Sequence, residues 1–318
     1  MNPAGRSGET ELTVVVVMLA GREPLIHCLN ALSRQAGAPA MEIIVPYDAR
    51  LADAGSLAAR FPSADFIALE GRRTYAELRA LGVRRARGAL VALTEDHCTP
   101  DPDWCARIVE AHRAPHAAIG GAVEKGPDTT VSWAVYLYDF SRYMTPLREG
   151  PARYLTDCNV SYKRAALGSI AEVWREEFHE TAVNWALEAR GETLWLSPRI
   201  IVRQQRTLRL VAAVRDRYAF GRLFASTRVA GATACRRAFY AGFSFLLPPL
   251  LVGRIAANVF RKRRHAGQLL RAAPALLLLT TAWAWGELVG YTTGRPGSSL
   301  APKAPRADAI SGSDPAAP

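Results

Sequence analysis

The sequence predicts an α/β domain built on a mostly parallel sheet, followed by apolar helices near the carboxyl end of the chain. From residue 12 onward, short apolar runs alternate with segments of helical periodicity. Strands of this length separated by helix-length crossovers are typical of βαβ units, which form parallel sheets. Two long apolar segments then follow residue 238. We therefore expect a sheet flanked by helices, with a second, helical part behind it.

The elements of the α/β domain can be assigned in order along the chain. The turn after the first strand lacks the G-x-G-x-x-G fingerprint of dinucleotide-binding folds, which disfavours a nicotinamide-dependent enzyme. We expect strands at 12–19, 42–46, 64–69, 89–94 and 117–123, and helices at about 23–35, 51–60 and 73–86.

A cluster of polar residues follows the fourth of these strands. The apolar run Leu90–Leu93 stops at Glu95–His97, and Pro100 prevents a continuing strand because proline has no N–H to donate. Ligands of open α/β sheets bind at the carboxyl ends of strands. Acids and a histidine at that place suit a divalent cation or a polar substrate. The alternative interpretation is a polar turn without function.

Two further residues lie where they can reach a ligand at this edge. Asp48 ends the second strand, where its carboxylate can accept a hydrogen bond from a base or ribose; a surface turn is the alternative. Arg79 lies on the helix before the acidic strand, and its guanidinium suits a diphosphate. The alternative is that Arg79 belongs to a solvated basic face together with Arg84, Arg85 and Arg87.

The positive charge of the chain is concentrated in one region. The chain carries a net charge of +11, yet the segment 199–271 alone holds sixteen Lys or Arg against one acid, Asp216. Such a surface binds nucleic acid or anionic lipid. Within it, 206–228 has the pattern of a basic amphipathic helix at a membrane interface. Because aromatic residues do not interleave with the charges and the flanks are apolar, we expect anionic membrane lipid and no nucleic acid as the partner.

Two apolar segments follow, at 239–260 and 272–291. Each is long enough for a hydrocarbon core of about 30 Å. Pro248 and Pro249 interrupt the first segment, and the basic cluster Arg261–Arg264 between the two would break the positive-inside tendency if both crossed. We expect a re-entrant or interfacial first segment and a spanning second one. Two buried helices of a soluble core are the alternative.

The order of the motifs resembles that of the family 2 glycosyltransferases, whose GT-A fold is a nucleotide-binding α/β domain. Glu95–His97 stands at the place of the family's Asp-x-Asp, with Pro100 and Trp104 following. Further on, 157–164 resembles its Gly-x-Asn-x-x-x-x-Arg segment and 178–185 its Glu-Asp motif. The resemblance covers about residues 12–225.

The resemblance implies an inverting, single-displacement transfer from a nucleotide-sugar donor. It implies that Glu180 is the catalytic base. The alternative is that Glu180 is a stabilising acid in the first turn of a helix. A divalent cation, Mn or Mg, would be held by Asp96 and His97. Donor binding is implied for Asp48, Arg79, Glu95 and Asp96, and acceptor-side positions for Asp157, Asn159 and Arg217.

Three departures from the family pattern bear on these roles. His97 replaces the second aspartate of Asp-x-Asp, Gln204 and Gln205 stand where a histidine often follows the later strand, and Thr181 replaces the aspartate of Glu-Asp. They motivate an alternative function, a catalytically degraded GT-A-fold protein that serves as a membrane binding or scaffold subunit. A nucleotidyltransferase with a similar sheet is a third possibility.

The expected organisation places the enzyme on the cytoplasmic face of the cell membrane, attached through its C-terminal region. The five cysteines are scattered without a C-x-x-C pair, which fits a reducing compartment. The membrane appendage suggests a lipid-linked or cell-envelope glycan as acceptor. The expected segments are a flexible N-terminus (1–11), the GT-A-like domain (12–205), basic juxtamembrane helices (206–238), membrane-associated helices (239–294) and a disordered tail (295–318).

Overall fold

The computed structural model of the chain describes residues 10–49, 54–71 and 73–295. They form two compact units. The first unit comprises the chain up to Glu124 together with Leu147–Arg203, and the second comprises Lys125–Pro146 together with the chain from Gln204 onward. Segment 125–146 therefore groups with the C-terminal helices, which its sequence did not indicate. The expected flexible ends fall almost wholly outside the described residues.

Four parallel strands form one half of the sheet in the first unit. They lie in the order β3-β2-β1-β4, and all four were predicted. The first strand ends two residues earlier than predicted. The N–H groups of Leu19 and Ala20 turn away from the sheet and donate to the carboxylate of Asp96, which follows the fourth strand. The bounds are β1 (Leu12–Val17), β2 (Met41–Asp48), β3 (Ala64–Leu69) and β4 (Leu90–Glu95).

The other half of the sheet is mixed rather than parallel. β8 (Asn159–Lys163), which the sequence did not predict as a strand, pairs antiparallel with β4 and with β6 (Ala118–Lys125). Beyond β6 follow β9 (Leu194–Gln204) and β5 (Cys98–Pro100), and β7 (Gly150–Pro151) pairs with β9. The insertion of β8 places residues just before Asn159 at the same edge as the carboxyl end of β4.

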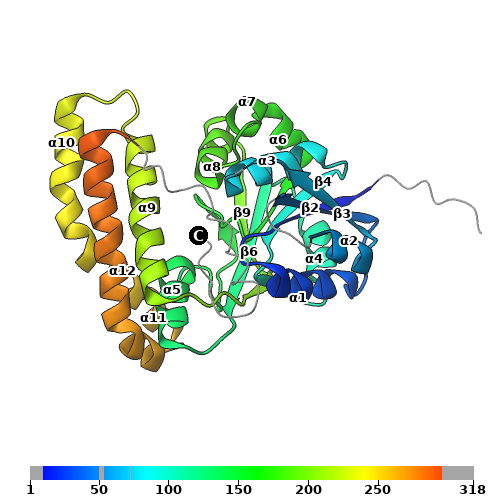
Figure 1. Cartoon of the computed structure of the whole chain (residues 1–318), viewed down its shortest axis with the longest axis horizontal. Helices are drawn as coiled ribbons and strands as arrows, with labels where there is room; N and C mark the ends of the chain where they lie inside the picture. Colours follow the sequence, from blue (N-terminus) through cyan, green and yellow to red (C-terminus); the bar gives the residue numbers. More distant parts are fainter. Residues whose placement is uncertain (1–9, 50–53, 72, 296–318) are drawn as a thin grey trace, which may run out of the picture. The chain divides into compact units, whose positions relative to one another are not determined.

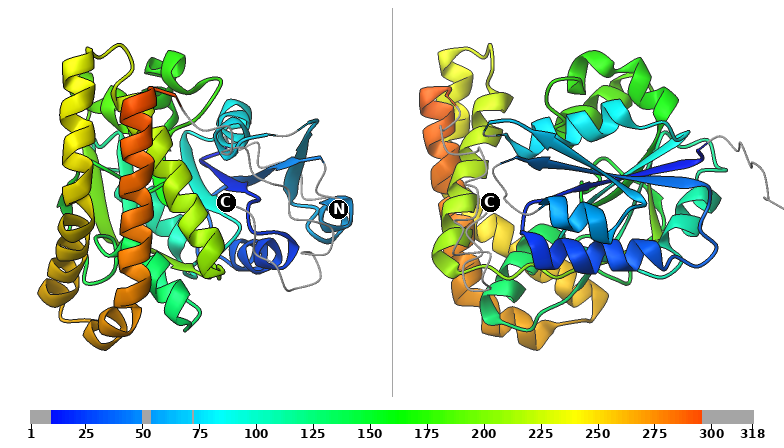
Figure 2. Two further views of the ribbon diagram at one scale, coloured as in Figure 1. Left: turned by 60° about the vertical axis from the view of Figure 1, so that its left-hand side comes forward. Right: turned by 45° about the vertical axis from the view of Figure 1, so that its right-hand side comes forward.

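Helices cover both faces of this sheet, as the views of Figure 1 and Figure 2 show. The strands β1 and β4 are buried along their whole length, which explains their continuous apolar sequences. A capping box at Thr74 and Glu77 starts α3 and sets which of its residues face the sheet. One face carries α1 (Arg22–Ser33), α2 (Ala54–Arg60) and α4 (Trp104–Ala111); the other carries α3 (Tyr75–Arg85), α6 (Arg164–Ser169), α7 (Ala171–Trp174) and α8 (Glu180–Ala189).

The second unit is helical. The predicted amphipathic helix forms as α9, and the prolines predicted to interrupt the first apolar segment stand in the first turn of α11, after a short 3-10 turn. Two helical stretches, Ala234–Lys262 and Ala266–Thr293, are long and apolar enough to cross a membrane by length and composition alone. The bounds are α5 (Thr130–Phe140), α9 (Leu210–Arg228), α10 (Ala234–Phe243), η1 (Ser244–Leu246), α11 (Leu247–Lys262) and α12 (Ala266–Thr293).

Candidate functional site

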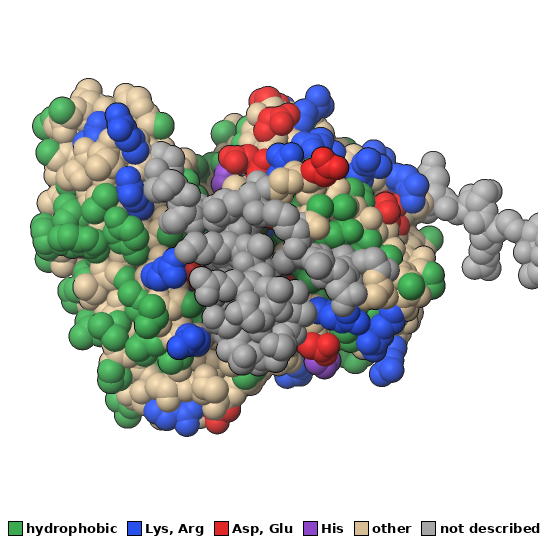
Figure 3. Space-filling view, viewed as in Figure 1, with side chains coloured by type: hydrophobic (Ala, Val, Ile, Leu, Met, Phe, Trp, Pro, Cys, Tyr) green, Lys and Arg blue, Asp and Glu red, His purple; other side chains and the backbone are tan. Residues whose placement is uncertain are grey.

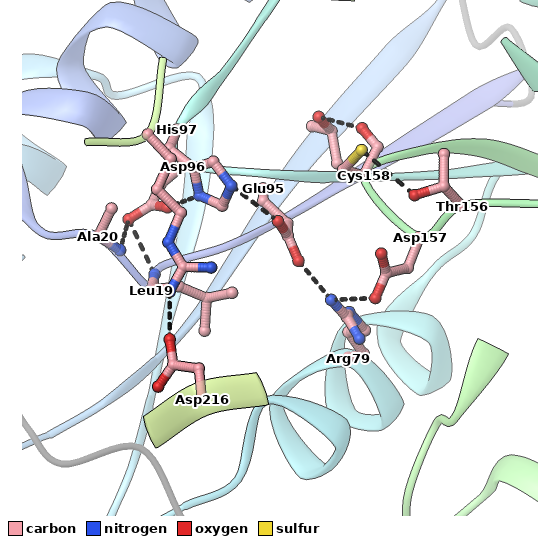
Figure 4. A network of polar contacts seen from close by, with 12 residues as sticks. Leu19, Ala20, Arg79, Glu95, Asp96, His97, Thr156, Asp157, Cys158 and Asp216 are labelled. Carbon is pink, nitrogen blue, oxygen red and sulfur yellow. Dashed lines mark hydrogen bonds and ion pairs between the residues drawn. The ribbon is translucent and has the colours of Figure 1, made fainter. Parts of the chain in front are cut away.

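The centre of the candidate site is Arg79, a buried arginine of α3. Its side chain is 2% exposed. Its Nη2 lies 2.5 Å from Oε1 of Glu95 and 2.6 Å from Oδ2 of Asp157 (Figure 4). The ring of Tyr75, one helical turn earlier, lies 4.8 Å from the guanidinium carbon. Arg79 is thus enclosed by two carboxylates and an aromatic face, so the solvated basic face considered for it is wrong.

The sheet topology explains why these residues meet. Glu95 is the last residue of β4. Asp157 lies two residues before β8, whose Asn159 pairs with Thr94 of β4. Antiparallel pairing therefore brings Asp157 back to the carboxyl end of β4, over which the buried face of α3 presents Arg79.

The carboxylates keep Arg79 charged in spite of its burial. Burial alone would lower the pKa of Arg79. The neighbouring carboxylates of Asp157, Glu95 and Glu180 more than offset this and raise that pKa. The site therefore holds a permanent cation out of contact with bulk water.

Glu180 faces the same cluster. It is the first residue of α8 and is partly exposed. The preceding residue, His179, packs its ring edge-on against Tyr75, with 6.4 Å between the ring centroids. Burial and then the charge of Glu180 raise the pKa of Tyr75. These contacts place the Glu180 carboxylate within electrostatic reach of Tyr75 and Arg79.

His97 is a second buried cation. Its ring is 3% exposed, with Nε2 3.0 Å from Oε2 of Glu95 and Nδ1 3.2 Å from Oδ1 of Asp96. Two ring nitrogens that both face carboxylate oxygens are those of an imidazolium, which donates from each. Burial lowers the pKa of His97, but the two acids outweigh it, and that pKa is raised to about 9.

Asp96 fixes the loop that follows β1. Its Oδ2 accepts the backbone N–H groups of Leu19, Ala20 and Gly21 at 2.8, 2.6 and 3.0 Å. Three such bonds hold a carboxylate in one orientation and join the ends of β1 and β4. Asp96 therefore organises the edge of the sheet where its neighbours act.

These side chains do not fit the predicted divalent cation. Asp96 is committed to three N–H groups, and His97 directs both ring nitrogens at acids. Glu95, His97 and Cys98 offer ligand atoms within 4.8 Å of one another. However, hydrogen bonding with Cys158 and burial raise the pKa of Cys98 well above its ordinary value, which disfavours the thiolate that a metal would need. Manganese and magnesium prefer oxygen ligands, which here already hold cations or amides.

Asp48 lies at the same edge of the sheet. It ends β2 and is 4% exposed, and its Oδ2 lies 3.4 Å from the backbone nitrogen of Arg73. β2 is two strands from β4, which corresponds to roughly 10 Å across the sheet. That separation is compatible with one extended ligand that reaches both Asp48 and the residues at the end of β4.

Asn159 makes other contacts than these. Asn159 is fully buried; its Oδ1 accepts from Trp104 Nε1 at 2.9 Å, and its Nδ2 donates to the carbonyls of Ala122 and Ile200 at 2.8 and 3.0 Å. These bonds use its amide to join strands, which leaves nothing for the acceptor contact expected from the sequence.

Arg217 belongs to the second unit. It is buried, pairs with Asp139 of α5 and lies 5.0 Å from the ring of Tyr138. These contacts hold α9 against α5.

Sequence reasoning missed one site residue, Tyr75. It identified Asp157 but not the ion pair of Asp157 with Arg79. Tyr75 precedes Arg79 by four positions, a spacing that places two residues on one helix face and could have revealed it. No local signal indicates that Asp157 pairs with Arg79. An open hollow of about 770 Å³ lies at the opposite edge of the sheet, near Arg84, Arg164 and Trp174, and contains none of the predicted residues.

Fold and site define the class of protein. A mixed α/β sheet ends in acids that surround a buried arginine. The sequence pattern described as glycosyl transferase family 2 matches residues 13–170. The chain belongs to this family and is a glycosyltransferase with the GT-A fold.

Among solved structures, a mannosyltransferase from Pyrobaculum calidifontis in complex with GDP-Man and Mn²⁺ is similar, with 18% identity and a TM-score of 0.49 over 91% of this chain and 86% of that one. No curated protein sequence matches this chain.

Proposed function

We propose that the protein transfers a sugar from a nucleotide-sugar donor, with inversion at the anomeric carbon, to a lipid-linked or cell-envelope glycan acceptor at the cytoplasmic face of the membrane. The observation that carries the proposal is the buried Arg79 cation with Glu95, Asp157 and Glu180 around it. Acid and cation are the two groups that a single displacement needs.

In this mechanism Glu180 acts as the base. Its carboxylate takes the proton of the acceptor hydroxyl while that oxygen bonds to the anomeric carbon. The bond from this carbon to the diphosphate oxygen breaks at the same time, and the nucleoside diphosphate leaves with the electron pair. Because the attack comes from the face opposite the leaving group, the configuration inverts.

Arg79 stabilises the charge on the leaving diphosphate. Its Nη1 is buried and makes no hydrogen bond within the described part of the chain, although Nη2 makes two ion pairs. A buried donor without an acceptor is costly, and an oxygen of the donor diphosphate would satisfy it. His97 adds a second positive charge beside Glu95. No step is assigned to a metal.

Asp48 is proposed to bind the nucleoside part of the donor. Its place at the end of β2 is the usual position for a carboxylate that receives a base or ribose. The membrane part of the proposal is supported by the basic segment 199–271 and by the two apolar helical stretches.

The test is donor turnover by the purified full chain with anionic lipid vesicles. Common sugar nucleotides are offered one at a time with a lipid-phosphate or glycan acceptor, and release of nucleoside diphosphate is measured. Proton NMR of the product reports the anomeric configuration. A product with the donor's configuration would overturn inversion.

A second candidate, a binding or scaffold protein without transfer, is favoured by His97 in place of the second Asp-x-Asp acid. Binding of a nucleoside diphosphate, seen as a thermal shift, without release from any donor would support it.

A further inference from the structure

We infer that the second unit lies in one leaflet of an anionic membrane, as an interfacial module, and that α12 does not cross the bilayer. The inference rests on the membrane attachment proposed above and names its form and its lipid partner. It differs from the expectation that the second apolar segment spans. Length does not decide the matter, because α12 has 28 residues and could cross.

The packing of α12 against α9 is the first argument. The two backbones touch at three glycines, where an added Cβ would meet a carbonyl oxygen of the other helix. Gly221 of α9 abuts Trp283, while Gly286 and Gly290 of α12 abut Tyr218 and Arg222. The helices form one packed pair, so α12 cannot enter the bilayer core without carrying α9 with it.

The charges on α9 make that insertion unfavourable. Helix α9 carries Arg215, Asp216, Arg217, Arg222 and Arg228 within nineteen residues. A charged side chain at the centre of a bilayer is expensive and is rare unless it serves a pore or proton path. α5, which also packs on α12, adds Asp139 beside Arg217, and Arg271 of α12 pairs with Asp128 at 2.6 Å. Charged pairs therefore stand near the start of α12, at Arg271, and between its neighbours α9 and α5, at Arg217.

The opposite side of the unit is apolar. On α12, exposed large side chains recur at a spacing that forms one stripe, and no charge interrupts it between Ala273 and Trp285. Figure 3 shows hydrophobic side chains gathered over α10 and α12. The exposed residues are Phe239 and Phe243 of α10, Phe245 and Leu246 of η1, Leu250 and Phe260 of α11, and Leu270, Leu277, Leu278 and Trp285 of α12, each at least half exposed.

An unpaired apolar face of this size opposite a charged face is the pattern of a module that lies at a membrane surface. The lipid must be anionic, because basic residues stand at both ends of the hairpin formed by α10–α11 and α12. Arg236 and Arg237 stand at one end, and Arg261–Arg264 at the other. In a spanning hairpin these clusters would face opposite sides. In an interfacial hairpin both reach the headgroups of one leaflet.

Two cysteines at the two ends of the hairpin test the inference. Cys235, at the start of α10, is exposed, and the other four cysteines are buried. Gly267, at the start of α12, has open space for a side chain. The full chain and the double variant Cys235→Ser/Gly267→Cys are bound to sealed vesicles of phosphatidylglycerol and phosphatidylcholine, then treated with a membrane-impermeant maleimide.

We expect both positions to be labelled from outside. Labelling of either position only after permeabilisation would overturn the inference, since a span puts the ends on opposite sides. A spin label at Leu270→Cys, Leu277→Cys and Trp285→Cys, each in the Cys235→Ser background, gives a second readout. We expect the spin label to lie at similar, shallow depths at the three positions. A label at position 277 that lies deepest, near the bilayer centre, would also overturn the inference.

Arg215→Cys, at an exposed position of α9, is the matched control and should remain in contact with water. Failure to bind these vesicles at all would refute the membrane partner. Neither result depends on sugar transfer, which is measured separately through nucleoside diphosphate release in detergent.

Discussion

Arg79 and Asp157 lie 78 residues apart in the sequence and 2.6 Å apart in the fold. The contact joins α3 to the turn before β8, and Glu95 at the end of β4 holds the same guanidinium nitrogen. A buried arginine held between two acids is a cation in a fixed place, as the proposed contact with a diphosphate requires. It also makes the site costly to disturb.

Replacing Arg79 should affect both stability and donor binding. Arg79→Ala leaves Glu95 and Asp157 without their cation, and we expect the free energy of unfolding to fall by about 3–5 kcal/mol. Arg79→Lys keeps the charge but loses the guanidinium geometry, so it should fold and bind a nucleoside diphosphate at least tenfold more weakly. Urea unfolding and calorimetry measure the two effects. Exposed Arg85→Ala on the same helix is the control, and equal donor affinity in Arg79→Lys would remove Arg79 from the diphosphate site.

Glu180→Gln should lower kcat by roughly 10²–10⁴-fold, the usual contribution of a general base, because the amide cannot accept the acceptor's proton. Donor affinity should change little. Single-turnover kinetics and calorimetry separate the two quantities. Glu188→Gln, an exposed acid of the same helix, serves as control. A near-normal kcat for Glu180→Gln would leave Glu180 with the role of a helix N-terminal acid.

The stability of the first unit should depend on pH through His97. Its pKa is about 9 in the fold against 6.5 for an ordinary histidine, so its stabilisation is complete below about 6.5 and is lost as the pH rises through 9. The shift corresponds to something on the order of 3 kcal/mol. Urea unfolding from pH 6 to 10 should show this fall in the wild type and a flatter profile in His97→Gln. Parallel profiles would contradict the imidazolium assignment.

Divalent metal should be dispensable for donor binding by the wild type. The cations Arg79 and His97 stand among the acids that would otherwise ligate a metal. Affinity for a nucleoside diphosphate should therefore be the same with Mn²⁺ and with chelator. His97→Asp removes one cation and adds oxygen ligands, so this variant should bind Mn²⁺, visible as loss of the free-ion EPR signal. Tight Mn²⁺ binding by the wild type would refute the prediction.

Asn159→Ala should reduce stability without a specific effect on the acceptor. The change leaves the indole N–H of Trp104 and two strand carbonyls without their buried partner, and we expect a loss of about 1–3 kcal/mol. The KM for acceptor should stay within about twofold at a temperature where the variant is folded. A selective rise in that KM would return Asn159 to the acceptor side.

The sequence alone determined the alternation of strands and helices, the acidic corner at the end of β4 and the basic, apolar C-terminal region. These features are local: apolar periodicity, proline and charge can be interpreted within a window of a few residues. The order of Glu95–His97, segment 157–164 and Glu180 was sufficient to indicate the family that residues 13–170 match.

Tertiary structure alone decided how these residues are partnered. β8 inserts antiparallel beside β4 and brings Asp157 to Arg79; no periodicity in either segment encodes that register. The same holds for His97, which resembles a metal ligand in sequence but is enclosed by two acids in the fold. A residue's charge state and bonding capacity depend on which distant groups surround it. Such contacts arise only when the chain closes its sheet, and for this reason the site's chemistry could be located from the sequence but not worked out from it.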